Sequence, residues 1–116
     1  AQIDVLVNRP LIAWVVENLC KNAVDAMNGK GRIYFQMVDS NEKKVQFDVV
    51  DSGKGVPSNK FKTIFKPGYT TKKRGWGLGL SLVKRIVENY HEGKIFVQSS
   101  EVGVGTRFRV ELKRLK

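Results

Sequence analysis

The chain has 116 residues, of which 41% are hydrophobic and 28% charged, and its formal net charge at pH 7 is +10. This length suits one compact domain, and the charged fraction is too low and too evenly mixed for a disordered chain. The sequence has no run of about 18 apolar residues that would span a membrane, and no signal peptide at its start. The single cysteine, Cys20, excludes an internal disulfide and fits a reducing compartment. The positive charge favours a polyanionic ligand, which could be nucleic acid, lipid headgroups or nucleotide phosphates.

The hydrophobic pattern predicts three helices and five strands. The first helix is marked by apolar residues at four-residue spacing, and its stripe consists of Leu11, Val15, Leu19 and Ala23. The helices are predicted at residues 10–27, 58–65 and 77–89, and the strands at 2–7, 32–38, 43–50, 94–100 and 106–112. In the third strand, Val45, Phe47 and Val49 face one way, and Gln46 and Asp48 face the other. The order predicts an α/β (α+β) two-layer sandwich, with a mixed, mostly antiparallel sheet of about five strands and three helices on one face.

Two asparagines, Asn18 and Asn22, are four residues apart and therefore share one face of the first predicted helix. Asparagine is a poor helix former, so two in mid-helix need a reason. One reason is that an amide oxygen can bind Mg²⁺, which also binds substrate phosphates. The other is that both lie at the edge of the buried face and bond to neighbours. Glu17, Lys21 and Asp25 alternate in sign at the same spacing, which is typical of surface ion pairing. For Glu17 this interpretation is less clear, because Glu17 adjoins Asn18.

Asp51 ends a predicted strand and opens a loop that contains Gly53 and Gly55. A carboxylate there could accept a hydrogen bond from an exocyclic amine, such as that of adenine, and the glycines would let the backbone pass close to a flat base. The alternative is a carboxylate that bonds to the amides of its own turn. Lys54 does not make a P-loop, because no Gly-Lys-Ser/Thr sequence is present.

Three alternate glycines, Gly75, Gly77 and Gly79, run directly into the last predicted helix. The free amides and positive dipole end of a helix N-terminus form a ready site for phosphate, and a tight turn alone would hardly need three glycines. Basic residues put positive charge before this run, namely Lys66, Lys72, Lys73 and Arg74. Tyr69 and Trp76 in the same loop could stack or pack, but no second aromatic and basic cluster supports nucleic acid binding.

The single histidine, His91, is not predicted to accept a phosphoryl group. It stands at a helix end before Gly93, where a side chain usually stabilises the terminus. Cys20 lies between apolar positions of the first helix and is predicted to be a buried structural thiol.

These motifs resemble, in order and spacing, those of the sensor histidine kinases, and the resemblance covers nearly the whole chain. Any one motif is weak, but the motifs together, in this order, are highly specific. The motifs are an asparagine box (Glu17 to Ala23), a first glycine box (Asp51 to Gly55), a phenylalanine box (Phe61 to Phe65), a lid motif (Thr70-Thr71-Lys72), a second glycine box (Gly75 to Leu80) and a last one (Gly103 to Thr106).

The resemblance implies the Bergerat-type ATP-binding sandwich shared with DNA gyrase B, MutL and the large heat-shock chaperone, with ATP and Mg²⁺ as cofactors. Asn22 would be the Mg²⁺ ligand, Asp51 would bind the adenine amine, and Thr106 would support that contact. Asn18, near the phosphates and the attacking group, would share the catalytic roles with Glu17 and with Lys72, which would cover the phosphates. The nucleotide site would also include Asp25, Gly53, Gly55, Val56, Phe65, Tyr69, Thr70, Thr71, Gly75, Gly77, Leu78, Gly79 and Leu80.

Two departures from related motifs sharpen this expectation. Gyrase-type ATPases carry a glutamate four residues before the metal asparagine to activate water, whereas this chain has Asn18, which argues against a self-contained ATP hydrolase. Many histidine kinases carry a lysine three residues after the metal asparagine, whereas this chain has Asp25. The second departure and the short lid resemble the nitrogen-regulation branch, and they leave the role of that lysine to Lys72.

The resemblance therefore implies a protein-histidine kinase domain that transfers the γ-phosphoryl group of Mg-ATP to a histidine on a separate helical dimerisation domain. We expect residues 1–116 to be one such domain, excised from a longer sensor kinase, cytoplasmic, monomeric by itself and without affinity for nucleic acid. A response regulator would be an indirect partner. The alternative is a non-catalytic nucleotide-gated interaction module of the same fold.

Overall fold

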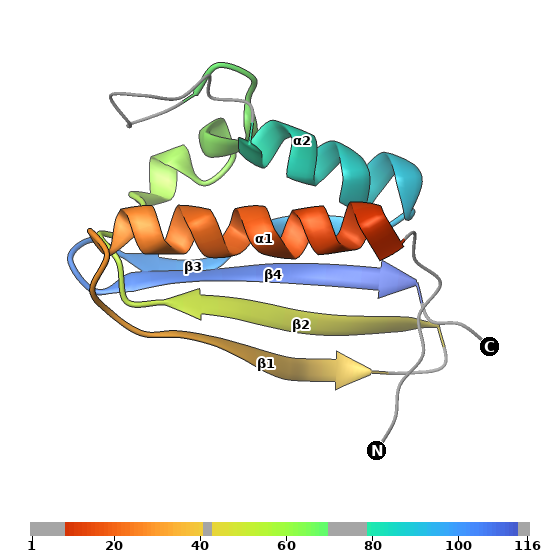
Figure 1. Cartoon of the computed structure of the whole chain (residues 1–116), viewed down its shortest axis with the longest axis horizontal. Helices are drawn as coiled ribbons and strands as arrows, with labels where there is room; N and C mark the ends of the chain where they lie inside the picture. The colour runs from red at the N-terminus through yellow and green to blue at the C-terminus, as the bar shows by residue number, and fades with distance from the viewer. Residues whose placement is uncertain (1–8, 41–42, 70–78, 114–116) are drawn as a thin grey trace.

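The computed structural model describes residues 9–40, 43–69 and 79–113, in which helices cover one face of a four-stranded sheet (Figure 1). The strands are β1 (Ile33–Ser40), β2 (Lys44–Asp51), β3 (Lys94–Glu101) and β4 (Gly105–Lys113), in the spatial order β1-β2-β4-β3. All three neighbouring pairs are antiparallel. The predicted two-layer sandwich is confirmed, and the strand predicted at residues 2–7 lies outside the described residues.

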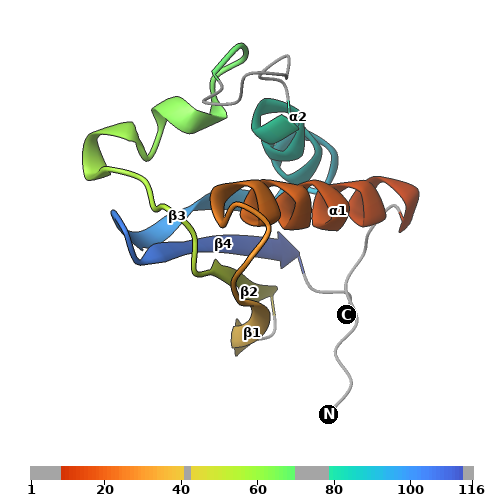
Figure 2. The ribbon, with the colours of Figure 1, turned by 60° about the vertical axis from the view of Figure 1, so that its left-hand side comes forward.

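The helical layer consists of α1 (Arg9–Ala26) and α2 (Gly79–Arg85), which lie on the same side of the sheet (Figure 2). α2 continues as a π-helical turn, η3 (Ile86–Tyr90). Two 3₁₀ turns, η1 (Ser58–Lys60) and η2 (Thr63–Phe65), replace the single helix predicted over residues 58–65. None of the described helices is long and apolar enough to cross a bilayer.

In the two short turns, backbone hydrogen bonds join residues three apart. Lys60 N–H donates to Pro57 O at 2.9 Å, and Lys66 N–H donates to Thr63 O at 3.0 Å. This is the tighter 3₁₀ pattern, which rarely extends beyond a few residues. The segment therefore turns twice and brings Phe65 into the core.

The core lies between the helices and the inner face of the sheet. The predicted stripe on α1 is confirmed at Val15, Leu19 and Ala23, which are buried, whereas its first member, Leu11, is only half-buried. Cys20, predicted to be buried, is only half-buried on the flank of that stripe. Phe65 meets Phe108 of β4 edge to face, with ring centroids 6.1 Å apart. The other buried members are Val49, Ile64, Val83, Val87, Ile95, Val97, Val110 and Leu112, each of which contributes about 1.5–3 kcal/mol by burial.

His91 lies just beyond η3, where the helical layer turns back into β3. Its side chain is buried, and its Nδ1 is 2.8 Å from the carbonyl oxygen of Ile86, so Nδ1 must carry the proton that it donates. Gly93 N–H donates to Val87 O at 2.9 Å and closes the same end. His91 thus stabilises a helix terminus, as its position in the sequence predicted.

Candidate functional site

Asp51 ends β2 on the inner face of the sheet, where its side chain is buried. The carboxylate Oδ1 accepts a hydrogen bond from Gly53 N–H at 2.8 Å, and the backbone amide of Thr106 donates a second. Burial raises the pKa of the Asp51 carboxyl, and the two backbone amides offset only part of that rise. Asp51 therefore does bond to an amide of its own turn, but a carboxylate has further lone pairs that can accept from other donors. The arrangement is a buried acceptor at the end of a strand.

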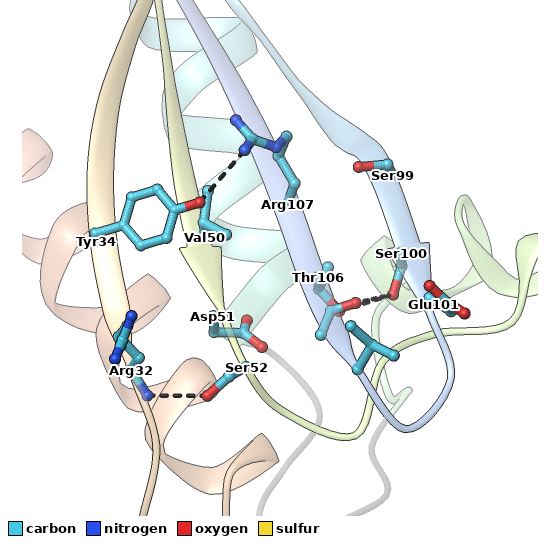
Figure 3. A pocket seen from close by; sticks show the side chains of 12 residues that line it. Arg32, Tyr34, Val50, Asp51, Ser52, Ser99, Ser100, Glu101, Thr106 and Arg107 are labelled. Atoms are coloured by element: carbon cyan, nitrogen blue, oxygen red, sulfur yellow. Dashed lines mark hydrogen bonds between the residues drawn. The ribbon is translucent and has the colours of Figure 1, made fainter.

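Thr106 is the cross-strand partner of Asp51 and belongs to a chain of hydroxyl groups. Its Oγ1 lies 2.9 Å from Ser100 Oγ, a pair that Figure 3 shows at the ends of β3 and β4. Ser100 Oγ in turn accepts a hydrogen bond from Val56 N–H at 2.7 Å and lies 2.9 Å from Gly105 O. This network joins the loop after Asp51 to the sheet. Sequence reasoning missed Ser100, because only the β3–β4 register reveals that it faces Thr106.

The loop after Asp51 is held between the end of α1 and the turn that joins β3 and β4. A Cβ atom on Gly53 would lie 2.7 Å from Cβ of Ala26, and Lys54 N–H donates to Ala26 O at 2.9 Å. Gly55 has φ +79°, and a Cβ there would overlap the carbonyl oxygen of Glu101. Both glycines are thus required by the packing of the protein itself, and a close approach to a base remains a prediction.

Asn18 of α1 faces the first residue of α2. Its Nδ2 donates to Trp14 O at 2.8 Å, and its Oδ1 lies 3.9 Å from the point where a Cβ on Gly79 would stand. Asn22 is half-buried one helical turn further on, whereas Glu17 and Asp25 are exposed. The bond to Trp14 bears out the interpretation that an asparagine here bonds to a neighbour, but it uses the amide nitrogen and leaves the oxygen directed toward α2.

The remaining predicted site residues divide into three groups. Phe65 is a core residue, and Lys84 Nζ lies 5.6 Å from the centroid of its ring. Tyr69 and Leu80 are partly buried against the core. Six predicted residues lie outside the described part of the chain: Thr70, Thr71, Lys72, Gly75, Gly77 and Leu78. The structure therefore brings Asn18 next to Gly79, and Asp51 next to Thr106, on the helix-covered side of the sheet.

Comparison with known proteins identifies the family. The model for histidine kinase-, DNA gyrase B-, and HSP90-like ATPases matches residues 8–116. Sporulation kinase E of Bacillus subtilis is 39% identical over 95 residues, which cover 82% of this chain and 13% of that protein. The sensor histidine kinase ZraS of Salmonella typhimurium is 41% identical over 101 residues, which cover 87% of this chain and 21% of that protein. The chain thus spans about a fifth or less of the length of these relatives.

Solved structures give the same result. The nucleotide-free catalytic domain of histidine kinase ThkA superimposes with a TM-score of 0.81 at 35% identity, over 95% of this chain and 70% of that one. Full-length ShkA in complex with AMPPNP gives a TM-score of 0.85 at 26% identity, over 99% of this chain and 24% of that one. The chain therefore belongs to the histidine kinase-, DNA gyrase B- and HSP90-like ATPase family, and it is an ATP-binding catalytic domain of the sensor histidine kinase type.

Proposed function

We propose that this domain binds Mg-ATP and transfers its γ-phosphoryl group to a histidine on a separate helical dimerisation domain. The observation that carries the proposal is the approach of Asn18 Oδ1 to Gly79 at the start of α2, on the side of the sheet where Asp51 is buried. Asp51 would accept the adenine amine. The phosphates would lie toward Asn18 and the beginning of α2, where backbone amides lack intrahelical partners.

The chemistry expected of these groups suits transfer of the phosphoryl group to a partner protein more than hydrolysis of ATP. Phosphoryl transfer depends mainly on positioning and on neutralising charge. Asn18 can orient a phosphate or an incoming group through its amide, but an amide does not act as a base toward water. A glutamate in its place would supply that base. The asparagine is therefore our reason for proposing a partner's histidine as the acceptor.

Asn22 fits the role of magnesium ligand by its chemistry, since it offers a neutral amide oxygen one turn from Asn18. Among residues 9–40, 43–69 and 79–113, no group of three or more His, Cys, Asp or Glu side chains could hold a metal ion. A magnesium ion here would therefore take most of its ligands from nucleotide phosphates and water, which is its usual behaviour in such sites. When bound, it would neutralise phosphate charge.

The partners and the location belong to the same proposal. The structure of ThkA in complex with the response regulator TrrA supports a response regulator as a partner of the parent protein of this chain. A cytoplasmic location would give the site its ATP, and the free thiol of Cys20 suits a reducing compartment.

Transfer is tested by mixing the domain with a helical phosphoacceptor fragment and ATP labelled at the γ-phosphate. We expect label on the fragment, which Asn22→Ala should abolish. Asn59→Ala is the matched control, because Asn59 is an exposed asparagine in η1. Label on His91 of the isolated chain would overturn the proposal. Magnesium-dependent nucleotide binding without transfer to any histidine fragment would instead favour the nucleotide-gated module.

A further inference from the structure

A hollow opens at one end of the sheet, mainly on the side that no helix covers. It has a volume of about 390 Å³ and lies at the end of the sheet where β2 stops and β4 starts. The strand register places Tyr34, Val50, Arg107 and Ser99 side by side across all four strands, and all four line the hollow. Figure 3 shows Tyr34 and Arg107 on either side of Val50, and Arg32 beside Ser52 nearer the end of the sheet. We call this hollow the outer pocket.

Arg32 is fixed at the mouth of the outer pocket by its backbone. Its N–H donates to Ser52 Oγ at 2.9 Å, and its carbonyl oxygen accepts from Ser52 N–H at 3.1 Å. Gly31 permits this approach, since a Cβ there would lie 2.6 Å from Ser52 Oγ. The guanidinium of Arg32 is exposed and makes no hydrogen bond or ion pair with any residue that the structure describes. The pocket therefore holds a full positive charge on a well-anchored residue.

Arg107 contributes a second guanidinium, and only some of its N–H groups donate hydrogen bonds within the part of the protein that the structure describes. Its Nη1 bonds to Asp48 Oδ2 at 2.6 Å and to Gln36 Oε1 at 3.1 Å, and its Nη2 lies 3.5 Å from Tyr34 Oη. Asp48 also accepts two hydrogen bonds from Arg109. Because two arginines share this one carboxylate, the cluster keeps one positive charge in excess, and Arg107 is the member that lines the outer pocket.

Hydroxyl groups surround the two arginines. Tyr34, Ser52 and Ser99 all line the outer pocket. Guanidinium groups with neighbouring hydroxyls match the donor pattern of oxygen anions, for which the planar fork of arginine is well suited. Two carboxylates also line the hollow. Asp51 is bound to backbone amides at its end, whereas Glu101 is exposed at the rim and opposes an anion.

We propose that the outer pocket binds a phosphate group, either as free phosphate or as a phosphate monoester on a polypeptide, between Arg32 and Arg107. Arg32, Tyr34 and Arg107 lie on the side of the sheet that no helix covers, opposite the proposed nucleotide site, although Asp51 and Thr106 of that site also line the outer pocket. The guanidinium groups of Arg32 and Arg107 supply the attraction and the donors, and the carboxylates of Glu101 and Asp51 act against it.

The test is a titration of the isotopically labelled domain followed by the NMR signals of the backbone amides. The probes are inorganic phosphate and a short phosphoserine peptide, at constant ionic strength and with sodium acetate as the reference anion. We expect saturable shifts at Arg32, Tyr34 and Ser99, with a Kd for phosphate on the order of 1 mM. Tighter binding of the phosphopeptide would assign the phosphate to a polypeptide, and equal or weaker binding would assign it to the free ion.

Three substitutions make the result specific. Arg32→Gln should weaken phosphate binding about tenfold, because it removes a charge-assisted donor without touching an internal contact. Arg85→Gln is the matched control, since it removes the same charge from an exposed position on α2 and should leave the affinity unchanged. Glu101→Gln should strengthen binding a few-fold. Equal weakening in both arginine variants, identical shifts with acetate, or shifts confined to α1 and α2 would each overturn the proposal.

Discussion

Asp51 and Thr106 are directly opposed at the end of the β2–β4 ladder, and the backbone amide of Thr106 donates to the buried Asp51 carboxylate. The pairing of β2 with β4 therefore holds the carboxylate from the side of Thr106. Gly53 N–H holds it from the loop that follows Asp51. Burial still raises the pKa of Asp51, which means that the protein keeps this anion at a cost to its own stability. A costly carboxylate suggests selection for binding.

Asp51→Asn separates that binding role from folding. The amide oxygen of asparagine can still accept from Gly53 N–H, but its NH₂ group would face the adenine amine donor to donor. We expect nucleotide affinity to fall by about 10- to 100-fold, the equivalent of one hydrogen bond to a charged group. Because the raised pKa makes the ionised carboxylate destabilising at neutral pH, the melting temperature should be unchanged or higher. Titration calorimetry with ADP and a thermal melt would check both.

The control for that substitution is Ser58→Ala, at an exposed position in η1 that should change neither quantity. If Asp51→Asn lowered the melting temperature strongly while nucleotide affinity stayed intact, Asp51 would be a structural residue only.

The same raised pKa predicts how nucleotide binding depends on pH. Protonation of Asp51 removes the acceptor, so affinity should decline as pH falls through the carboxyl's pKa, above the ordinary value of 3.8. The folded state binds this proton more tightly than the unfolded chain does, so the decline in affinity is not a loss of stability at Asp51. ADP affinity measured between pH 7 and pH 4, with Asp51→Asn as the reference for changes in the nucleotide itself, would reveal it. If ADP affinity declined equally in the wild type and in Asp51→Asn, Asp51 would not be the acceptor of the adenine amine.

Asp48 shows the opposite behaviour on the outer face of the sheet. Burial acts to raise its pKa, but the hydrogen bonds and charges of Arg109 and Arg107 outweigh burial and lower it. A lowered pKa in the folded state contributes stability that is present above the unfolded value and is lost as pH falls through the folded one. The ion cluster should therefore persist at pH values where Asp51 is already protonated.

Asp48→Asn should lower the free energy of unfolding by about 2–3 kcal/mol at pH 7, because it leaves two partly buried guanidinium groups without their shared anion. Urea unfolding of the variant would measure this change, and the difference from the wild type should shrink toward pH 3. Glu92→Gln is the control, since its ion pair with Lys113 at 2.8 Å joins two exposed side chains and should contribute nothing measurable. A loss that did not depend on pH would argue against the charge as its cause.

Asp48 and Ser100 make contacts that could not be predicted from the sequence. Alternation along the third predicted strand correctly turned Asp48 away from Val45, Phe47 and Val49, but it did not predict that the Asp48 side chain is fully buried. Its cover comes from Arg107 and Arg109, which are about 60 residues away in the chain and reach it only through the β2–β4 register. Ser100 meets Thr106 for the same reason. Local periodicity predicts which way a side chain points, but strand register decides what it meets.

The helix stripe, by contrast, depended only on local spacing, so Val15 and Leu19 were predicted correctly. The same holds for the paired asparagines on one face of α1. The single helix predicted at residues 58–65 was wrong in detail, because two 3₁₀ turns bring Phe65 inward to Phe108. Tertiary packing selected the tighter turns there, which no pattern in those eight residues specified.

A last prediction tests whether the loop after Asp51 must be held rigidly for nucleotide binding. Gly55 and Gly68 both have positive φ angles, +79° and +86°. A Cβ on Gly55 would overlap the carbonyl oxygen of Glu101, whereas nothing lies within 4 Å of a Cβ on Gly68. Both alanine variants therefore share the cost of a left-handed backbone, about 1–2 kcal/mol, but only Gly55→Ala must also push the loop away from the β3–β4 turn.

We expect Gly68→Ala to lower stability modestly and to leave ADP affinity unchanged. Gly55→Ala should lower stability further and reduce ADP affinity at least tenfold, since displacement of the loop moves Val56 away from Ser100 and loosens the support of Thr106. Thermal melts and calorimetry on the two variants would separate the shared backbone cost from the displacement. If both variants bound ADP as the wild type does, the contact between this loop and the β3–β4 turn would serve folding alone, and the carboxylate of Asp51 would not depend on it.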